Sequence, residues 1–284
     1  MKNIAFIIYR AWAFKILDLV FASLKKNYKF ILITTKNHEV NLKKYAYFKI
    51  YKIDPNDNLI LENILKKNQI EVTFFYGWSW MISENIYKNF LSLCLHPSKL
   101  PKYKGGSPLQ HQIIDGIKQS AVSIFRISKG IDSGPIYKKV NLSLNGELKN
   151  IFRRISFIGS KITIKLLNDF NINKKIFFFK QKKIPKIYKR RRKKDSEFKL
   201  EDVKNKSFFY LNNFIRSLND PYPNAYFEFD DKLIFITKIR KIKKNYKNKT
   251  IDNLKKLKPK LKSNYIKLKD SYARIEKGYI KKIS

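Results

Sequence analysis

The chain has 284 residues, of which 44% are hydrophobic and 15% aromatic, so a sizeable core is expected and wholesale disorder is excluded. Its 62 Lys and Arg residues outnumber its 22 Asp and Glu residues, which gives a formal net charge of +40 at pH 7. A charge of this sign is typical of proteins that bind nucleic acid or other polyanions, but Lys, Asn, Ile, Phe and Tyr are overused along the whole chain, which also indicates drift of the coding sequence toward A and T.

Strand and helix patterns alternate through the first 180 residues. The apolar runs predict strands at 3–8, 30–34, 46–53 and 70–76, a strand that ends at 96, and strands at 121–127 and 136–144. Between them the spacing predicts helices up to residue 24 and at 58–67, 84–89, 107–116 and 148–170. This order is typical of an α/β fold, here a Rossmann-like, mostly parallel twisted sheet with helices on both faces.

The composition changes near residue 174, and a dense basic run at 188–194 has the character of an exposed connection. Beyond it we predict a helix at 207–218, a hairpin of strands 225–229 and 233–239, and short strands at 265–268, 272–275 and 278–283. We therefore predict three regions: a catalytic domain at 1–180, a basic linker at 181–206, and a small β-rich C-terminal domain at 207–284.

The sequence also predicts where the protein works. Its single cysteine excludes an internal disulfide framework and fits a reducing compartment. No apolar run is long enough to span a bilayer, and no small-residue cleavage site follows the first run, so we expect no secretory signal. These observations predict a cytoplasmic protein.

Residues 93–110 combine three features of a ligand-binding crevice. Pro97 biases His96 toward extended geometry, so this histidine should stand at the tip of a strand. Gly105-Gly106 allows a close backbone approach, and Ser107-Pro108 is typical of a helix start. Open α/β sheets bind their ligands in crevices of this kind.

Three histidines are present, and His96 is the candidate for proton transfer. His38 lies in a polar loop and His111 in the first turns of a helix. Asp132 follows 36 residues after His96, on a glycine-flanked loop at the end of the next strand, and we expect neighbouring strand ends to bring the two together. Such a pair fixes the imidazole tautomer and stabilises its protonated form. A structural histidine and an Asx turn at Asp132 remain open alternatives.

Two motifs at this spacing resemble those of a known enzyme family. The first reads Leu-His-Pro-Ser at 95–98, then Leu-Pro at 100–101 and Tyr-Lys-Gly-Gly-Ser-Pro at 103–108, and the second reads Gly-Ile-Asp-Ser-Gly at 130–134. Together they resemble the signature of the 10-formyltetrahydrofolate-dependent formyltransferases, over at least residues 70–140. Three later blocks more loosely resemble the junction and C-terminal domain of that family, at 188–191, 214–218 and 221–225.

The resemblance implies formyl transfer from 10-formyltetrahydrofolate, as co-substrate, to an amine, with no metal. The amine would attack the formyl carbon, and His96 would manage protons and help stabilise the tetrahedral intermediate, with Asp132 supporting it. Two segments would line the folate pocket, largely through backbone groups: Gly77, Trp78, Ser79, Trp80 and Met81 at a strand end, and Lys129, Gly130, Ile131 and Asp132 in the second motif. For Trp78 and Trp80, a place in the core is an equally open alternative.

One position departs from the family pattern. The family usually has Asn two residues before the histidine, where it would hydrogen-bond the formyl oxygen, and this chain has Cys94. A thiol is a weak donor compared with an amide NH₂. The catalytic role of Cys94 is therefore doubtful: either another donor compensates, or the chemistry is slow or altered. A nucleophilic role is disfavoured, because nothing in the sequence asks for a covalent intermediate.

The resemblance also bears on the amine acceptor. Initiator methionyl-tRNA formyltransferases carry a basic insertion after the second strand, and residues 35–45 hold no such loop, so an amino sugar on a nucleotide carrier is favoured, as in surface-polysaccharide biosynthesis. Methionyl-tRNA is the alternative, and a non-catalytic basic binding module is a third possibility. Candidate substrate contacts are Arg10, Lys104, Ser107 and Gln110. Arg10 is as readily a surface residue, and Gln110 also completes a capping box with Ser107. No membrane partner is expected, and a homodimer is left open.

Overall fold

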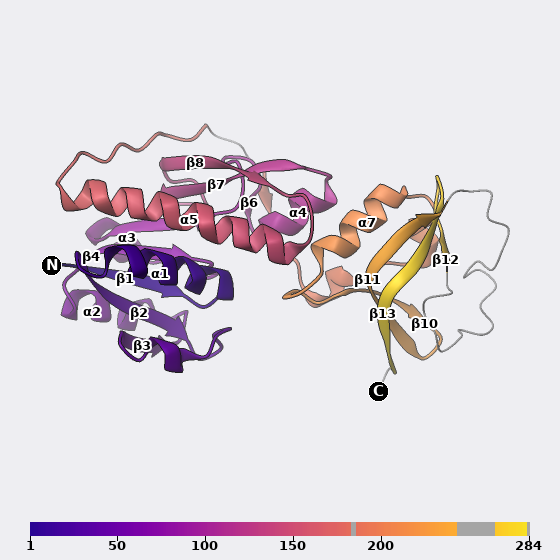
Figure 1. Ribbon diagram of the computed structural model, residues 1–284, viewed down its shortest axis with the longest axis horizontal. Coiled ribbons are helices and arrows are strands. Elements are labelled where there is room, and N and C mark those ends of the chain that lie inside the picture. The colour runs from indigo at the N-terminus through magenta and orange to yellow at the C-terminus, as the bar shows by residue number, and fades with distance from the viewer. Residues whose placement is uncertain (183–185, 243–264, 283–284) are drawn as a thin grey trace. The chain divides into compact units, whose positions relative to one another are not determined.

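The computed structural model describes residues 1–182, 186–242 and 265–282 (Figure 1). These residues form two compact units, each discontinuous in sequence. The first unit comprises Met1–Gly105, Gln119–Ser143 and Asn150–Ile187, and the second comprises Gly106–Lys118, Leu144–Lys149 and Tyr188–Ser284. The short helix that follows the Gly105-Gly106 step therefore belongs to the second unit.

A seven-stranded sheet forms the centre of the first unit. Its strands in spatial order are β3 (Lys49–Ile53), β2 (Tyr28–Thr35), β1 (Lys2–Ile8), β4 (Ile70–Tyr76), β5 (Leu91–His96), β7 (Gln119–Arg126) and β8 (Ile136–Ser143). The first five are parallel, while β7 runs antiparallel to both β5 and β8. A mostly parallel sheet is therefore confirmed, with an antiparallel edge.

Helices cover both faces of this sheet, as predicted (Figure 1). On one face lie α1 (Ala11–Leu24) and α5 (Leu148–Asn171), where Ser156 donates a hydrogen bond to the Trp12 carbonyl oxygen at 2.8 Å. On the other face α2 (Asn58–Lys67) and α3 (Glu84–Asn89) pack against alternate residues of the strands, such as Ile7 and Phe75. A 3₁₀ turn, η1 (Leu42–Tyr45), precedes β3. Within the described ranges, no helix has the length and apolar character needed to cross a membrane.

The second unit is built on a four-stranded antiparallel sheet. Its order is β10 (Ala225–Phe229), β11 (Lys232–Ile242), β13 (Tyr272–Lys282) and β12 (Tyr265–Lys267). One face packs on α7 (Phe208–Ser217), through a core that includes Phe214, Phe227 and Ile234. The remaining elements of this unit are α4 (Pro108–Ile114), η2 (Lys193–Ser196) and α6 (Leu200–Val203). A separate two-stranded ladder joins β6 (Lys104–Gly105), which ends a segment of the first unit, to β9 (Ile187–Tyr188). The antiparallel C-terminal strands confirm the predicted β-rich character of this region.

The strand prediction at the C-terminus is wrong in one respect. Residues 272–275 and 278–283 were expected as two strands, and β13 runs through both without a break up to Lys282, while residue 283 lies outside the described residues. Gly278 passes so close to β11 that a Cβ there would lie 2.2 Å from the Phe235 carbonyl oxygen. After Ile236 the register shifts, because Ile236 pairs with Gly278 while Lys238 pairs with Lys277, which leaves one extra residue in β11. The glycine therefore marks a bulge rather than a strand end.

Gly278→Ala should therefore destabilise the full-length protein. The added methyl group has to displace the backbone of β11, and an overpacked contact of this kind costs about 1–3 kcal/mol of unfolding free energy. The measurement is urea unfolding followed by circular dichroism. Lys277→Ala, at the neighbouring exposed position, is the matched control and should stay within about 0.5 kcal/mol of wild type. Equal midpoints for Gly278→Ala and wild type would contradict the tight approach.

Candidate active site

His96 is the last residue of β5 and projects from the face of the sheet opposite α5. Side chains alternate along a strand, and Leu95 points toward Gly159 of α5, so Cys94 and His96 point the other way. Cys94 packs against a small apolar cluster that includes Phe125 of β7. The strand thereby places the thiol and the imidazole side by side on one surface.

The structure brings His96 and Asp132 together. The imidazole Nδ1 lies 3.3 Å from Asp132 Oδ2, and the side chains are only 7% and 17% exposed. The imidazole Nε2 lies 2.8 Å from the carbonyl oxygen of Tyr103. Since a carbonyl oxygen only accepts, Nε2 carries a proton, and Nδ1 faces a carboxylate. Nδ1 is therefore the ring nitrogen that lies toward the acid.

Asp132 reaches His96 by a different route from the one expected. Because β7 is antiparallel to β5, its carboxyl end lies beside Leu93, where Arg126 pairs, and not beside the tip of β5. The loop after β7 instead folds back over the Cys94 and His96 face. Asp132 has a left-handed backbone with φ of +47°, and its Oδ2 also accepts the Gly105 N–H at 2.7 Å. Its carboxylate thus bonds across the site rather than closing an Asx turn.

Cys94 lies beside this pair and stays protonated. Burial raises the pKa of the Cys94 thiol well above its ordinary value, and the negative charge of Asp132 raises it further. The thiol sulfur lies 3.8 Å from its nearest hydrogen-bond acceptor, the Leu95 carbonyl oxygen. A neutral, partly buried thiol is a poor nucleophile. The absence of a covalent role for Cys94 stays a prediction.

The turn after β4 carries a cluster of aromatic rings. Gly77 has φ of +69°, and the two indoles that follow lie 5.0 Å apart between ring centroids. Tyr9 lies 5.0 Å from the Trp80 ring, and its hydroxyl bonds Ser79 Oγ at 2.8 Å. Trp78 also packs against the core cluster that contains Phe75, while both tryptophans stay partly exposed. The turn is therefore rigid, with part of each indole at the surface.

The second segment predicted to bind folate is the loop after β7. Gly130 has φ of +95°, and Ile131 is 41% exposed. Ile127, which precedes this loop, and Trp78, in the turn after β4, pack against the same core cluster.

Arg10 and Lys104, two of the predicted substrate contacts, are held differently. Arg10 forms an ion pair with Glu39, and its guanidinium carbon lies 4.5 Å from the Tyr9 ring centroid. The other Glu39 oxygen accepts the Ala11 N–H at 2.9 Å, so Glu39 occupies the start of α1. Lys104 is buried, with 6% of its surface exposed.

Ser107 and Gln110 belong to the second unit, and the predicted capping box is wrong. Ser107 has a left-handed backbone with φ of +53° and makes no cap hydrogen bond to α4. Its Oγ instead accepts the backbone N–H of Arg191 at 3.0 Å. Gln110 is buried, and its Oε1 has no hydrogen-bond partner among the residues described. The serine hydroxyl is taken by a backbone group 84 residues away in the sequence, which the local sequence does not reveal.

The other histidines have ordinary partners. His38 Nδ1 bonds the Val40 carbonyl oxygen at 2.7 Å, and His111 Nε2 bonds that of Lys189 at 2.9 Å. In the part of the chain that the structure describes, no three His, Cys, Asp or Glu side chains gather as a metal site requires. The contacts of the Tyr103 carbonyl and the Gly105 N–H could not be predicted, because every residue carries these backbone groups and only the glycine hints at a close approach.

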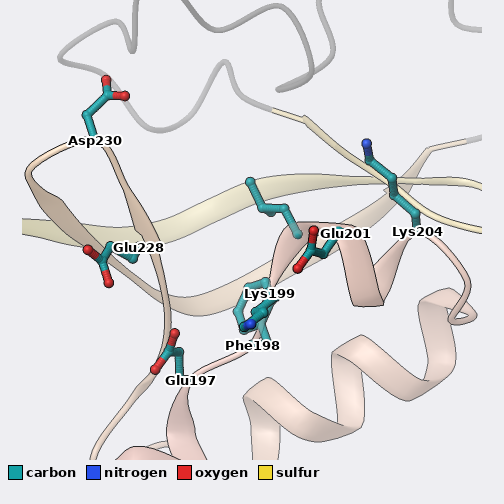
Figure 2. Close-up of a pocket in the computed structure, with 8 residues that line it drawn as sticks. Glu197, Phe198, Lys199, Glu201, Lys204, Glu228 and Asp230 are labelled. Atoms are coloured by element: carbon teal, nitrogen blue, oxygen red, sulfur yellow. The ribbon is translucent and has the colours of Figure 1, made fainter.

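A hollow of about 610 Å³ lies in the second unit, and Figure 2 shows the side chains that line it. Four carboxylates and two lysines line it together with two apolar side chains: Glu197, Glu201, Glu228, Asp230, Lys199, Lys204, Phe198 and Leu200. None of the predicted site residues lines this hollow, so it forms no part of the candidate site.

Cys94 is the chain's single cysteine, so its reactivity can be measured directly. Because burial and the Asp132 charge raise its pKa, alkylation by iodoacetamide at pH 8 should be at least roughly tenfold slower than that of free cysteine. Asp132→Asn removes the second cause, lowers the Cys94 pKa and should accelerate alkylation a few-fold, as measured by mass spectrometry. Asp231→Asn, at an exposed site in the second unit, is the control and should change nothing. Alkylation as fast as that of free cysteine would refute the argument.

Comparisons with known proteins relate the chain to formyltransferases. A family model described as formyl transferase matches residues 34–167. The methionyl-tRNA formyltransferase of Rickettsia prowazekii (strain Madrid E) is 31% identical over 185 residues, which cover 64% of this chain and 58% of that relative. The match thus spans less than two thirds of the relative's length.

Solved structures share the fold. The methionyl-tRNA formyltransferase from Clostridium thermocellum superposes with a TM-score of 0.64 at 24% identity, covering 87% of this chain and 96% of that one. A 4-N formyltransferase from Francisella tularensis gives 0.65 at 18% identity, covering 80% and 92%. Residues 34–167 thus match the formyl transferase family model, and the His96–Asp132 pair lies within the matched region.

Proposed function

We propose that this chain transfers a formyl group from 10-formyltetrahydrofolate to a primary amine. The contact between His96 and Asp132 carries the proposal, because it supplies a proton-transfer couple inside the region that matches the formyl transferase family. When bound, the folate supplies a formyl group on nitrogen that an amine can attack. With Nε2 protonated and Nδ1 unprotonated, the couple accepts the proton that the amine loses and then returns it to the folate nitrogen that leaves as its bond to the formyl carbon breaks. The imidazolium formed in between stabilises negative charge on the formyl oxygen.

The residues of the two folate-binding segments suit a flat heteroaromatic ligand. Trp78 Nε1 is buried and has no acceptor among the described residues, so it can donate to a ligand ring. Ile131 is 41% exposed and Met81 is 68% exposed, which leaves apolar surface for a ring system to cover. Gly77 and Gly130, both with positive φ, fix the two turns that carry these side chains.

For the acceptor we propose methionyl-tRNA. The Rickettsia relative is named for this substrate, and the Clostridium enzyme of that name is covered over 96% of its length, which includes a C-terminal region. The second unit carries the basic run, of which Lys189, Arg190 and Arg192 are exposed. A polyanion gains more from such a run than a small nucleotide does, because each neutralised phosphate releases counterions.

A nucleotide-linked amino sugar is the second candidate, favoured by the loop after β2. Glu39 donates its N–H to the Tyr9 carbonyl oxygen at 3.0 Å and pairs with Arg10, so the loop lies against the start of α1 and offers no basic arm. The same pair leaves Arg10 neutralised, which weakens its predicted role as a diphosphate contact.

The decisive experiment offers both acceptors to the full chain with 10-formyltetrahydrofolate. We expect formylation of charged initiator tRNA and none of a panel of nucleotide-linked amino sugars, measured by mass spectrometry of the amine. His96→Asn should lower kcat by about 10²–10⁴, the usual contribution of acid–base catalysis, with an unchanged melting temperature. Formylation of an amino sugar alone would reverse the choice of acceptor. No turnover with any acceptor would refute formyl transfer and favour a non-catalytic basic module.

Cys94→Asn should leave kcat unchanged or raise it. An amide NH₂ is a better donor to the formyl oxygen than the neutral thiol, and one preorganised donor is worth roughly 10²–10³ in rate. Cys94→Ala removes the thiol without adding a donor and is the matched control, expected at or below the wild-type rate. A collapse of turnover in Cys94→Asn with unchanged folding would show that the thiol itself is required.

A further inference from the structure

Gln181 follows α5 on a segment that pairs with the start of β8. Phe179 exchanges two backbone hydrogen bonds of 2.8 Å with Ile136, which sets an antiparallel register. Gln181 lies two residues beyond Phe179, and Gly134 lies two residues before Ile136, so the register brings them opposite each other. The Gln181 Nε2 donates to the carbonyl oxygens of Gly134 at 2.7 Å and Asp132 at 2.9 Å. One side chain thereby holds the loop at two points.

The loop needs such a hold, because its backbone is tightly constrained. Asp132 adopts a left-handed conformation that L-residues with a Cβ rarely take. A Cβ on Gly134 would lie 1.8 Å from the Arg126 carbonyl oxygen, so the chain returns in close contact with the end of β7. The direction of the Asp132 carboxylate, toward His96 and the Gly105 N–H, depends on this local backbone.

A primary amide is the side chain that these contacts require. The two N–H groups of glutamine Nε2 match two carbonyl acceptors, and a carboxylate of the same shape has no donor. The Gln181 Oε1 is buried and lacks a hydrogen-bond partner in the part of the chain that the structure describes, so these two N–H bonds are its side chain's polar contacts there.

We propose that Gln181 is a positioning residue that fixes the Asp132 carboxylate against His96. Its effect on catalysis rests on the formyl transfer proposed above, whereas its effect on the geometry of Asp132 does not. Gln181 bonds only the backbone of the loop, and it acts on the chemistry through Asp132. Its loss should therefore mimic a partial loss of the Asp132 carboxylate.

The geometric part is tested by amide hydrogen exchange at Gly105, whose N–H donates to Asp132 Oδ2. Gln181→Glu keeps the shape and removes both donors, and we expect exchange at Gly105 to accelerate roughly tenfold, as it should in Asp132→Asn. Gln119→Glu makes the same chemical change at an exposed position of β7 and should leave Gly105 protected. Gln181→Met, which is uncharged, replaces Gln181→Glu if the latter does not fold.

The catalytic part is tested by a double-mutant cycle on kcat for formyl transfer. Gln181→Glu should lower kcat by about 10- to 100-fold, since small misplacements of a catalytic group have effects of this size. In the Asp132→Asn background the same substitution should lower kcat less than twofold, because the group that it positions is already lost. The full chain and 10-formyltetrahydrofolate are used throughout.

The outcomes separate the two proposals. Unchanged Gly105 exchange in Gln181→Glu and Gln181→Met would overturn the positioning role whatever the enzyme does. Effects on kcat that multiply in the double variant would also overturn it, since Gln181 would then act independently of Asp132. Accelerated exchange without turnover in wild type would uphold the positioning role and count against formyl transfer.

Discussion

The candidate site depends on one contact, between the Asp132 carboxylate and the His96 imidazole. Sheet geometry alone does not produce it, because β7 is antiparallel to β5 and ends beside Leu93. The contact exists because the loop after β7 reverses over the face of β5 and takes a left-handed backbone at Asp132. The sheet therefore positions the imidazole, and the loop positions the carboxylate that pairs with it.

The same carboxylate adds to the effect of burial on Cys94. Burial raises the pKa of the thiol, and a negative charge beside it opposes ionisation further. The arrangement that places an acid against the imidazole thus also disfavours a thiolate next to it. Under the proposed formyl transfer, the formyl oxygen would find its positive partner at His96 rather than at position 94.

Much of the fold could be predicted, because it follows from local patterns. The strand at 70–76 and the helix at 58–67 were predicted at the bounds that β4 and α2 have, since a continuous apolar run and helical spacing are both properties of short stretches of sequence. Two features could not be predicted: the unbroken course of β13, and the Ser107 side chain that leaves α4 uncapped. They depend on groups distant in the sequence, the Phe235 carbonyl and the Arg191 N–H. The role of Gln181 could not be predicted for the same reason, because its partners are backbone carbonyls nearly 50 residues earlier in the chain.

The choice between a polyanionic and a small acceptor depends on where exposed positive charge gathers. Acids pair with individual cations in both units: Glu39 pairs with Arg10, Asp169 with Lys165 and Glu276 with Lys238. The basic run instead places several exposed cations next to one another along the chain: Lys189, Arg190, Arg192, Lys193 and Lys194. Such a run can interact with a repeating phosphate backbone at several points, whereas a single diphosphate engages one or two cations. This local density of exposed charge, more than the total charge, supports the proposed tRNA acceptor.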